Sequence, residues 1–286
     1  MSYEVLMNSI RKCLETYPDK KVSGISRRRH GSAAGIPFEE WARDAFRQCN
    51  FNVFLQEEFI EYIIGELKRI GFSREKIRSI IKERTWWGIG DYVISKSQLD
   101  AALNSKKVPV YQQSIADVVI FYGEIGARDL GSLNNVLLVN VKSHDMSKLS
   151  RPPNIISALR VLEFARDLLR RSLQHPDFIE KANLIFIGIY YQSVNNYAQI
   201  MKIYIRDFFK LDVTRMPPIN FDAANQIQWH IKDMVENPSV DKLTFFKSIA
   251  KKYLDEWQKF MSLRTSDVRN LVGELERLIE RFRQNK

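Results

Sequence analysis

Two apolar segments in the middle of the chain constrain the fold more than any other feature. Residues 115–122 (IADVVIFY) and 136–142 (VLLVNVK) have the length and the nearly continuous apolar character of buried strands. Polar side chains interrupt both segments, with Asp117 in the first and Asn140 and Lys142 in the second. Because a buried polar side chain requires a partner or a function, these residues mark a candidate site. The connection of 13 residues between the segments fits a long hairpin that would bring them together.

The other predicted strands place this hairpin in a mixed sheet. Segments 116–122, 136–142, 183–191 and 199–206 are predicted as strands, and a helix predicted over 155–173 lies between the second and the third. A strand, a helix and a further strand form a right-handed crossover, so we expect a mixed sheet with helices on its faces. The expected fold class is α/β.

Helices are predicted for most of the remaining sequence, because apolar residues recur there at three- and four-residue steps. Pro37 suits the first turn of a helix that runs to about Gln48, and Ser73 is the expected N-cap of another. The segment between 86 and 113 lacks a clear period and is predicted to be a long loop with one short helix. The predicted helices cover residues 2–16, 37–48, 55–70, 73–84, 97–104, 155–173, 222–235, 240–263 and 265–283.

The last predicted helix carries a narrow apolar seam. Val268, Leu271, Leu275, Leu278 and Phe282 are three or four residues apart, which is the spacing of a coiled-coil seam that could pair with another subunit. The seam covers fewer than three heptads, so we expect it to pack against the same chain.

Composition limits the partner and the compartment. The formal net charge of +10 favours an anionic partner such as nucleic acid, although many basic proteins bind none. No apolar run is long enough to span a membrane and the N-terminus lacks the layout of a secretory signal, so a cytoplasmic protein is expected. Cys13 and Cys49 are too few for a zinc site or a disulfide framework and are predicted to be buried thiols.

Acidic side chains beside a lysine suit the hydrolysis of phosphodiesters. Carboxylates bind Mg²⁺, which activates water, while lysine orients the nucleophile or stabilises the transition state. As a spacing pattern alone this combination is weak, because it occurs often by chance. Glu39 could complete such a site or could simply favour the N-terminus of its helix. His144 is expected to be a polar loop residue, and the run of Arg27, Arg28 and Arg29 could contact phosphates or be solvated.

Three islands of the sequence resemble the HincII/HindII-like type II restriction endonucleases, a branch of the PD-(D/E)xK nuclease superfamily. The first is 31–39 (GSAAGIPFE), and the second joins the strand of Asp117 to 139–142 (VNVK). The third joins 153–158 (PNIISA) to 223–233 (AANQIQWHIKD). Together these islands are much more specific than the catalytic pattern.

The resemblance implies an α/β fold with a restriction-endonuclease-like core, a mixed β-sheet flanked by helices, and extra N- and C-terminal helices. We expect one elaborated nuclease domain over residues 1–286, with its core at about 30–235 and a helical extension at about 240–286. The resemblance also implies a prokaryotic homodimer that binds a short palindromic site in double-stranded DNA. Each subunit would cleave one strand with Mg²⁺.

The resemblance assigns roles to individual residues. Asp117, residue 140 and the backbone carbonyl of Val141 would bind the metal, and Lys142 would assist the attacking water. The loop at 148–154 matches a DNA-reading segment of the family. The contacts expected there are Ser147 and Lys148 with phosphates and Arg151 and Asn154 with bases, since Arg suits guanine and Asn suits adenine.

Asn140 departs from the family pattern, which has Asp or Glu at this position. An amide oxygen can bind Mg²⁺ but carries no charge, so metal affinity and water activation are expected to fall. Either the chain was changed to a cleavage-defective form, which the intact surrounding pattern favours, or it is naturally altered. Two other functions stay open: a DNA-binding protein of the same fold that does not cut, and a structure-specific repair nuclease. RNA binding has less support, because no aromatic-rich recognition motif is present.

Overall fold

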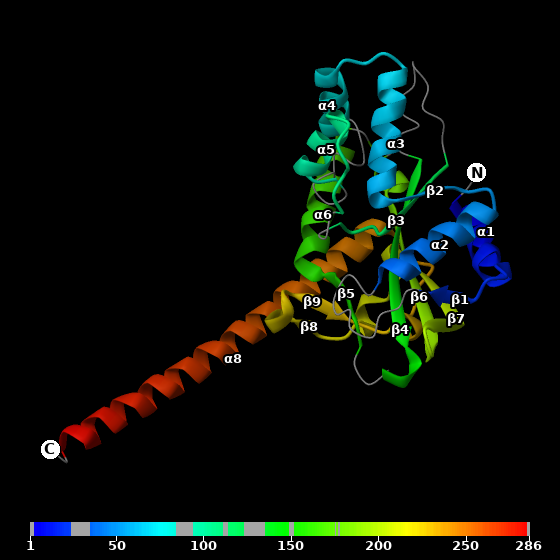
Figure 1. Ribbon diagram of the computed structural model, residues 1–286. Coiled ribbons are helices and arrows are strands. Elements are labelled where there is room, and N and C mark those ends of the chain that lie inside the picture. Colours follow the sequence, from blue (N-terminus) through cyan, green and yellow to red (C-terminus); the bar gives the residue numbers. More distant parts are fainter. Residues whose placement is uncertain are drawn as a thin grey trace.

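A computed structural model of the protein describes residues 3–23, 35–83, 94–110, 114–122, 135–148, 152–174, 176 and 178–284. In this part of the chain a curled sheet of six strands is flanked by helices (Figure 1). The strand order is β1-β7-β6-β4-β3-β2, with β4 and β6 parallel and the other neighbours antiparallel, so the predicted mixed α/β fold is confirmed. The strands are β1 (Lys21–Ser23), β2 (Asn52–Leu55), β3 (Val118–Phe121), β4 (Val136–Asp145), β6 (Asn183–Val194) and β7 (Tyr197–Asp207).

The two faces of the sheet pack against different helices, because successive side chains of a strand point to opposite faces. On β4, Leu137 and Val139 belong to a core shared with α1 (Tyr3–Thr16) and α2 (Ile36–Gln48). Leu138, between them, belongs to a larger core that includes the remaining helices. These are α3 (Gln56–Arg69), α4 (Arg74–Glu83), α5 (Lys96–Leu103), α6 (Ala158–Ser172), α7 (Phe178–Lys181) and α8 (Lys242–Gln284).

The predicted hairpin and crossover are confirmed. β3 and β4 pair antiparallel with Val118 opposite Val139, and β6 returns parallel to β4 after α6. Ser73 caps α4 as predicted, because its hydroxyl oxygen accepts a hydrogen bond from the backbone N–H of Lys76 at 3.2 Å. Among the described residues, no helix is both long and apolar enough to cross a membrane.

The helix predicted over 222–235 is wrong, because this segment contributes to a second, three-stranded sheet. Ala224 and Asn225 have φ angles of 53° and 59°, a left-handed conformation that a helix cannot continue through. The apolar residues that follow alternate with polar ones, and Ile227 and Trp229 are buried, as a strand period predicts. The order of this sheet is β5-β9-β8, formed by β5 (Asn154–Ser157), β9 (Gln226–Gln228) and β8 (Ile219–Asn220).

The predicted start of the crossover helix at residue 155 is also wrong. Ile155 and Ile156 are β-branched residues, which favour extended backbone, and both are buried in β5. The helix α6 begins only at Ala158. The strand β5 therefore separates the end of β4 from the crossover helix.

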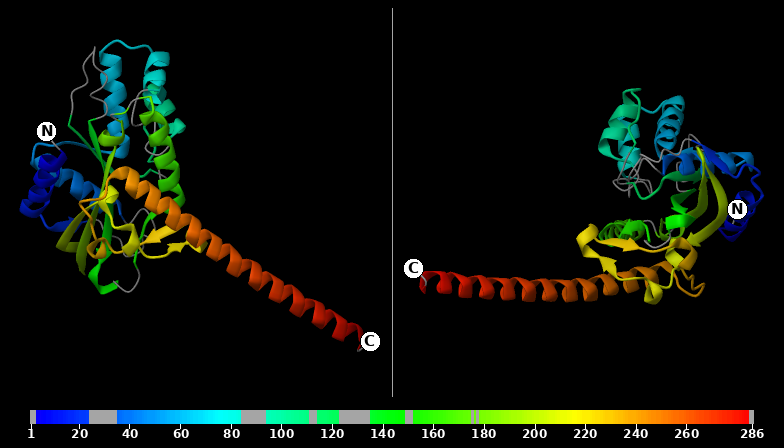
Figure 2. Two further views of the ribbon diagram at one scale, coloured as in Figure 1. Left: turned by 180° about the vertical axis from the view of Figure 1, so that it is seen from behind. Right: turned by 60° about the horizontal axis from the view of Figure 1, so that its bottom comes forward.

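The helices predicted at 240–263 and 265–283 are one continuous helix, α8, since neither glycine nor proline lies near the predicted break. Its first part packs on the larger core through residues such as Phe245, and the rest extends away from the body in all three views (Figures 1 and 2). Val268 and Leu271 are 59% and 66% exposed, so the predicted packing of the seam against the same chain is wrong at these positions. The side chains of Leu275, Leu278 and Phe282 lie outside those that the structure describes.

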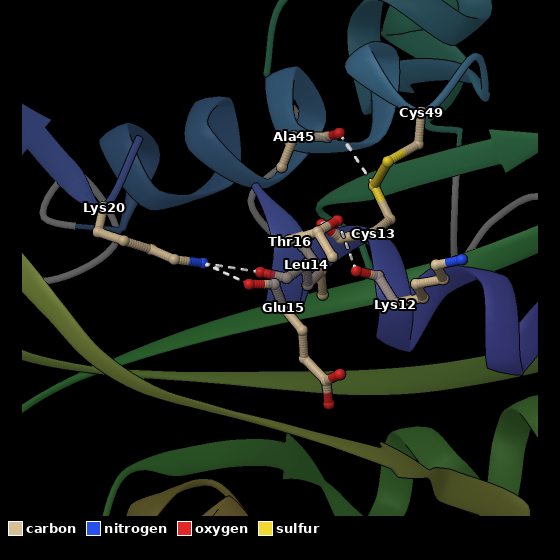
Figure 3. Close-up of a disulfide and its surroundings, with 8 residues drawn as sticks. All are labelled: Lys12, Cys13, Leu14, Glu15, Thr16, Lys20, Ala45 and Cys49. Atoms are coloured by element: carbon tan, nitrogen blue, oxygen red, sulfur yellow. Dashed lines mark hydrogen bonds between the residues drawn. A yellow bond between two sulfur atoms is a disulfide. The ribbon is translucent and has the colours of Figure 1, made fainter. Parts of the chain in front are cut away.

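Cys13 in α1 and Cys49 directly after α2 form a disulfide (Figure 3). The prediction of two buried thiols is therefore wrong, and Cys49 is in fact exposed. The Cα atoms are 6.0 Å apart, although 36 residues separate the two cysteines in sequence. Lys20 donates to the carbonyl oxygen of Leu14 at 2.9 Å and so satisfies one acceptor at the end of α1. The position of Cys13 follows from the packing of α1 on α2, which no local sequence pattern reveals.

Candidate active site

The β3–β4 hairpin brings Asp117 and Lys142 together. Asp117 lies directly before β3, where its backbone N–H donates to the carbonyl oxygen of Val139 at 2.9 Å. Its Oδ2 atom accepts a hydrogen bond from the backbone N–H of Val141 at 2.8 Å and lies 3.6 Å from Nζ of Lys142. The side chains of Asp117 and Lys142 are 21% and 24% exposed. The carboxylate is thus held in one orientation and still reachable from solvent.

Asn140 lies on β4 directly after Val139, the residue whose carbonyl oxygen bonds to Asp117, and is 4% exposed. Its Nδ2 donates to the carbonyl oxygen of Ile115 at 3.1 Å. Its Oδ1 is buried and has no hydrogen-bond partner among the described residues. Leaving a buried acceptor unpaired costs about 1–3 kcal/mol, so an orphaned oxygen in the middle of a strand indicates a position for a ligand.

Glu39 approaches the same site from α2. Glu39 is partly buried, whereas Glu40 beside it is exposed. Exposure is what we expect of an acid that only favours a helix N-terminus, so it fits Glu40 and not Glu39. Burial, and next the nearby carboxylate of Asp117, raise the pKa of Glu39 to about 8, although Lys142 opposes the shift. The structure therefore brings Glu39 within electrostatic range of both Asp117 and Lys142, a proximity that the sequence left open.

The oxygen atoms at this site fit a hard divalent cation. The carboxylate of Asp117 and the unpartnered Oδ1 of Asn140 are the ligand types that Mg²⁺ prefers. Within the part of the chain that the structure describes, no three His, Cys, Asp or Glu residues form a group that could hold a metal. Amide and backbone oxygens would therefore have to complete the site, and a single carboxylate on the hairpin would leave it poor in negative charge.

His144 lies within β4, so the prediction of a polar loop residue is wrong. Its side chain is 6% exposed and stacks on the ring of Tyr190 with the centroids 4.5 Å apart. Burial, together with the nearby His230 and Lys142, lowers the pKa of His144 to about 4. The imidazole is therefore neutral near pH 7 and adds no positive charge beside Lys142.

The predicted DNA contacts are only partly within the described chain. Ser147 lies in a short 3₁₀ turn, Met146–Lys148, directly after β4. Its backbone N–H and its hydroxyl both donate to Oδ1 of Asp145, at 3.0 and 2.7 Å, so its donors are already engaged in the turn. Asn154 is exposed at the start of β5. Arg27, Arg28, Arg29 and Arg151, and the side chain of Lys148, lie outside the described residues.

Two further residues beside the predicted DNA-reading segment escaped the sequence analysis. Asn220 and Gln228 form side-chain hydrogen bonds across the second sheet, and Gln228 also bonds to Asn154. Gln228 was predicted to lie in a helix over 222–235 and Asn220 before it, so no sequence pattern placed these amides on one face of a sheet.

Comparison with protein families identifies the chain. The family model described as restriction endonuclease HincII matches residues 17–278, which is most of the 286 residues. A search of curated proteins gave no match. The matched region contains the hairpin of Asp117 and Lys142, the helix of Glu39 and the second sheet, while α1 lies before it. The chain belongs to the HincII family of restriction endonucleases.

Proposed function

We propose that this type II restriction endonuclease hydrolyses phosphodiester bonds in a short palindromic site of double-stranded DNA and depends on Mg²⁺. The observation that carries the proposal is the fixed carboxylate of Asp117 beside the ammonium of Lys142, at the end of a hairpin in a chain of this family. A net charge of +10 supports an anionic substrate.

The roles of the residues follow from their chemistry. We assign the metal to Asp117, Oδ1 of Asn140 and the backbone carbonyl of Val141. When bound, Mg²⁺ neutralises charge on the scissile phosphate and promotes deprotonation of water. Lys142 donates hydrogen bonds that orient the attacking water and stabilise the negative charge that develops. The hydrogen bond from the backbone of Val141 keeps the carboxylate of Asp117 in place during these steps.

We infer that Asn140 impairs cleavage and that Glu39 partly compensates for it. The hairpin contributes one carboxylate where two acids are expected, and the electrostatic interactions of Glu39 include both Asp117 and Lys142. A second carboxylate would strengthen cation binding by direct charge attraction. The chain would then be a slow nuclease rather than an inert one.

Replacing Asn140 by Asp tests the proposal. The Asn140→Asp variant should convert plasmid DNA into discrete fragments with Mg²⁺, at least about 100-fold faster than the unchanged chain, since one charged ligand can contribute several kcal/mol to the transition state. Adding Lys142→Ala to this variant should abolish the fragments. Folded Asn140→Asp protein that yields no fragments would contradict the proposal.

A DNA-binding protein that does not cut is the second candidate, and the uncharged Asn140 is the observation that favours it. It predicts specific binding to a duplex that stays intact with either residue at position 140. A structure-specific repair nuclease would instead prefer branched or nicked DNA to a linear palindrome. Cleavage assays on matched linear and branched substrates separate these outcomes.

We further infer that two copies act together, because a palindromic site has two-fold symmetry that a homodimer matches. The surface that we assign to the second copy is the exposed apolar face of α8, which includes Val268 and Leu271 of the predicted seam and continues toward the body. Its described residues follow heptad spacing over about 25 Å of helix. They are Leu254, Trp257, Met261, Val268 and Leu271, which are 54%, 38%, 43%, 59% and 66% exposed.

A further inference from the structure

A row of side-chain amides crosses the second sheet and ends at Asn154. Figure 1 shows β5, β9 and β8 lying together, and Asn154 pairs directly with Gln228 across β5 and β9. Nε2 of Gln228 donates to Oδ1 of Asn154 at 2.8 Å. Nδ2 of Asn220 donates to Oε1 of Gln228 at 3.1 Å, and Oδ1 of Asn220 accepts from the backbone N–H of Ala223 at 3.1 Å.

A backbone group sets the direction of this row. The N–H of Ala223 can only donate, so it must face the oxygen of the Asn220 amide. The nitrogen of Asn220 then faces Gln228 and requires its oxygen, which turns the nitrogen of Gln228 toward Asn154. Rotating any one amide by half a turn would place two donors or two acceptors against each other. The orientation of each amide is therefore fixed by the network.

Asn154, the last amide of the row, has an amide nitrogen that is available to donate to a ligand. Asn154 is exposed, its Oδ1 already accepts from Gln228, and its Nδ2 has no hydrogen-bond partner in the described chain. Aligned hydrogen bonds polarise one another, which strengthens the terminal donor. The two-point contact with adenine that the sequence predicts would require the oxygen edge of Asn154 as well as its nitrogen edge.

We propose that Asn220 and Gln228 are positioning residues that hold Asn154 as a hydrogen-bond donor to an acceptor atom on a base edge. In the major groove such acceptors are N7 and O6 of guanine, O4 of thymine and N7 of adenine, and only guanine and thymine present acceptors without a donor. This inference rests on the proposed function, because it takes Asn154 to be one of the residues that contact DNA. It makes Asn154 a reader of acceptors instead of a reader of adenine, and it gives two amides outside the predicted reading loop a part in specificity.

Reversing the polarity of the row tests the proposal. In the variant Gln228→Glu, the new carboxylate accepts from Nδ2 of Asn220 and also from Nδ2 of Asn154, which turns the oxygen of Asn154 outward. The base preference at one position of each half-site should then change from an acceptor-bearing base to one that presents a donor, such as adenine or cytosine. The same position should lose about tenfold or more of its discrimination in Asn154→Ala.

The measurement is selection of bound duplexes from a randomised library by the full chain, with Ca²⁺ in place of Mg²⁺ so that the DNA stays intact. Gln226→Glu is the matched control, because it adds the same charge to β9 at a residue that pairs with Asn220 but whose side chain forms no hydrogen bond with the row in the described chain. It should weaken binding of all sequences alike. Thermal unfolding of each variant shows whether the sheet has remained folded.

The outcomes separate failure of this inference from failure of the proposed function. A changed preference at the position relaxed by Asn154→Ala supports the inference. If Asn154→Ala relaxes one position but Gln228→Glu behaves like Gln226→Glu, the row does not set the polarity and the inference is overturned. If Asn154→Ala relaxes no position, Asn154 reads no base. If the unchanged chain enriches no sequence at all, the proposed specific binding is wrong and the inference falls with it.

Discussion

At the scale of single residues, the candidate site lies where polar side chains interrupt apolar strands. Asn140 is the clearest case, because a 4% exposed amide with an unpartnered oxygen lowers stability unless a ligand uses it. The neighbouring carboxylate of Asp117 accepts a hydrogen bond from a backbone N–H, so its orientation is set without any ligand. Glu39 is partly buried near Asp117, and both burial and the negative charge of Asp117 oppose the ionisation of its carboxyl group.

Glu39→Gln is expected to change how stability depends on pH in the metal-free protein. Burial, and next the carboxylate of Asp117, raises the pKa of Glu39 from 4.5 to about 8. The folded state therefore holds this proton more tightly than the unfolded chain does, so the stabilisation is complete below the unfolded pKa and is lost as the pH rises toward 8. Urea unfolding in EDTA should show a free energy of unfolding that falls more steeply over this range than in Glu39→Gln.

Glu40→Gln is the control for this experiment, because Glu40 is the exposed neighbour on the same helix. Its pH profile should follow that of the unchanged chain. The free energy of unfolding could instead depend on pH with the same slope in Glu39→Gln and in the unchanged chain. Glu39 would then not interact with Asp117, and its proposed part in the metal site would lose its support.

Gly188→Ala should destabilise the sheet next to the candidate site. Gly188 pairs with Lys142, and a Cβ atom added there would lie 2.8 Å from Cβ of Ile231, which is fixed to the backbone and cannot rotate away. Overpacking of this kind costs roughly 1–3 kcal/mol. Gly65→Ala, in the exposed interior of α3 with nothing near the added Cβ, should instead stabilise by about 1 kcal/mol. Equal effects of the two changes on chemical denaturation would contradict this reading of Gly188.

At the scale of elements, the same polar residues depend on which segments become strands. The segment 222–235 has apolar residues that fit a helix period loosely, but a left-handed turn at Ala224 and Asn225 interrupts it, and the residues that follow form β9, which pairs with β8 and β5. Without those strands, Asn154 would have no partner for its amide and the row of amides could not form. Helix propensity is a weak preference, and pairing with β5 overrides it here.

The disulfide that joins α1 to the end of α2 should stabilise the N-terminal layer. Closing a loop between Cys13 and Cys49 restricts the unfolded chain, which typically contributes about 2–4 kcal/mol. Cys13→Ser, or reduction of the unchanged chain, should therefore lower the midpoint of urea unfolding. Thiol titration should find no free thiol before reduction and two after it. Two free thiols in the untreated protein would mean that the disulfide does not form.

At the scale of the whole molecule, α8 begins on a compact body and then projects from it as a long helix (Figure 2). Arg264 occupies one heptad position between Met261 and Val268 and forms an ion pair with Asp222 on the body. Beyond this point the described side chains of the helix are exposed apart from Gly273, which is partly buried. Exposed apolar residues at heptad spacing on a free helix are typical of a surface that binds another chain.

The pair Val268→Asp and Leu271→Asp should therefore convert the proposed dimer into monomers without lowering the stability of the body, since both positions are exposed. Sedimentation measures the oligomeric state, and plasmid assays in the Asn140→Asp background measure the consequence. Monomers should leave nicks in one strand where dimers leave double-strand breaks. The matched control is Arg269→Asp with Asn270→Asp, on a neighbouring face of the same turn. A dimer that persists in the seam variant would show that the second copy binds elsewhere.

The sequence by itself determined the parts of this protein that local patterns encode. The apolar runs predicted the strands, their polar interruptions identified Asp117, Asn140 and Lys142 as a candidate site, and three islands that resemble a known family predicted the family. Only the tertiary structure decided which distant residues join them: Glu39 from α2, Cys13 against Cys49, and the amides of Asn220 and Gln228 beside Asn154. The physical reason is that strand periodicity and buried polarity act within a few residues, whereas these contacts depend on how whole elements pack.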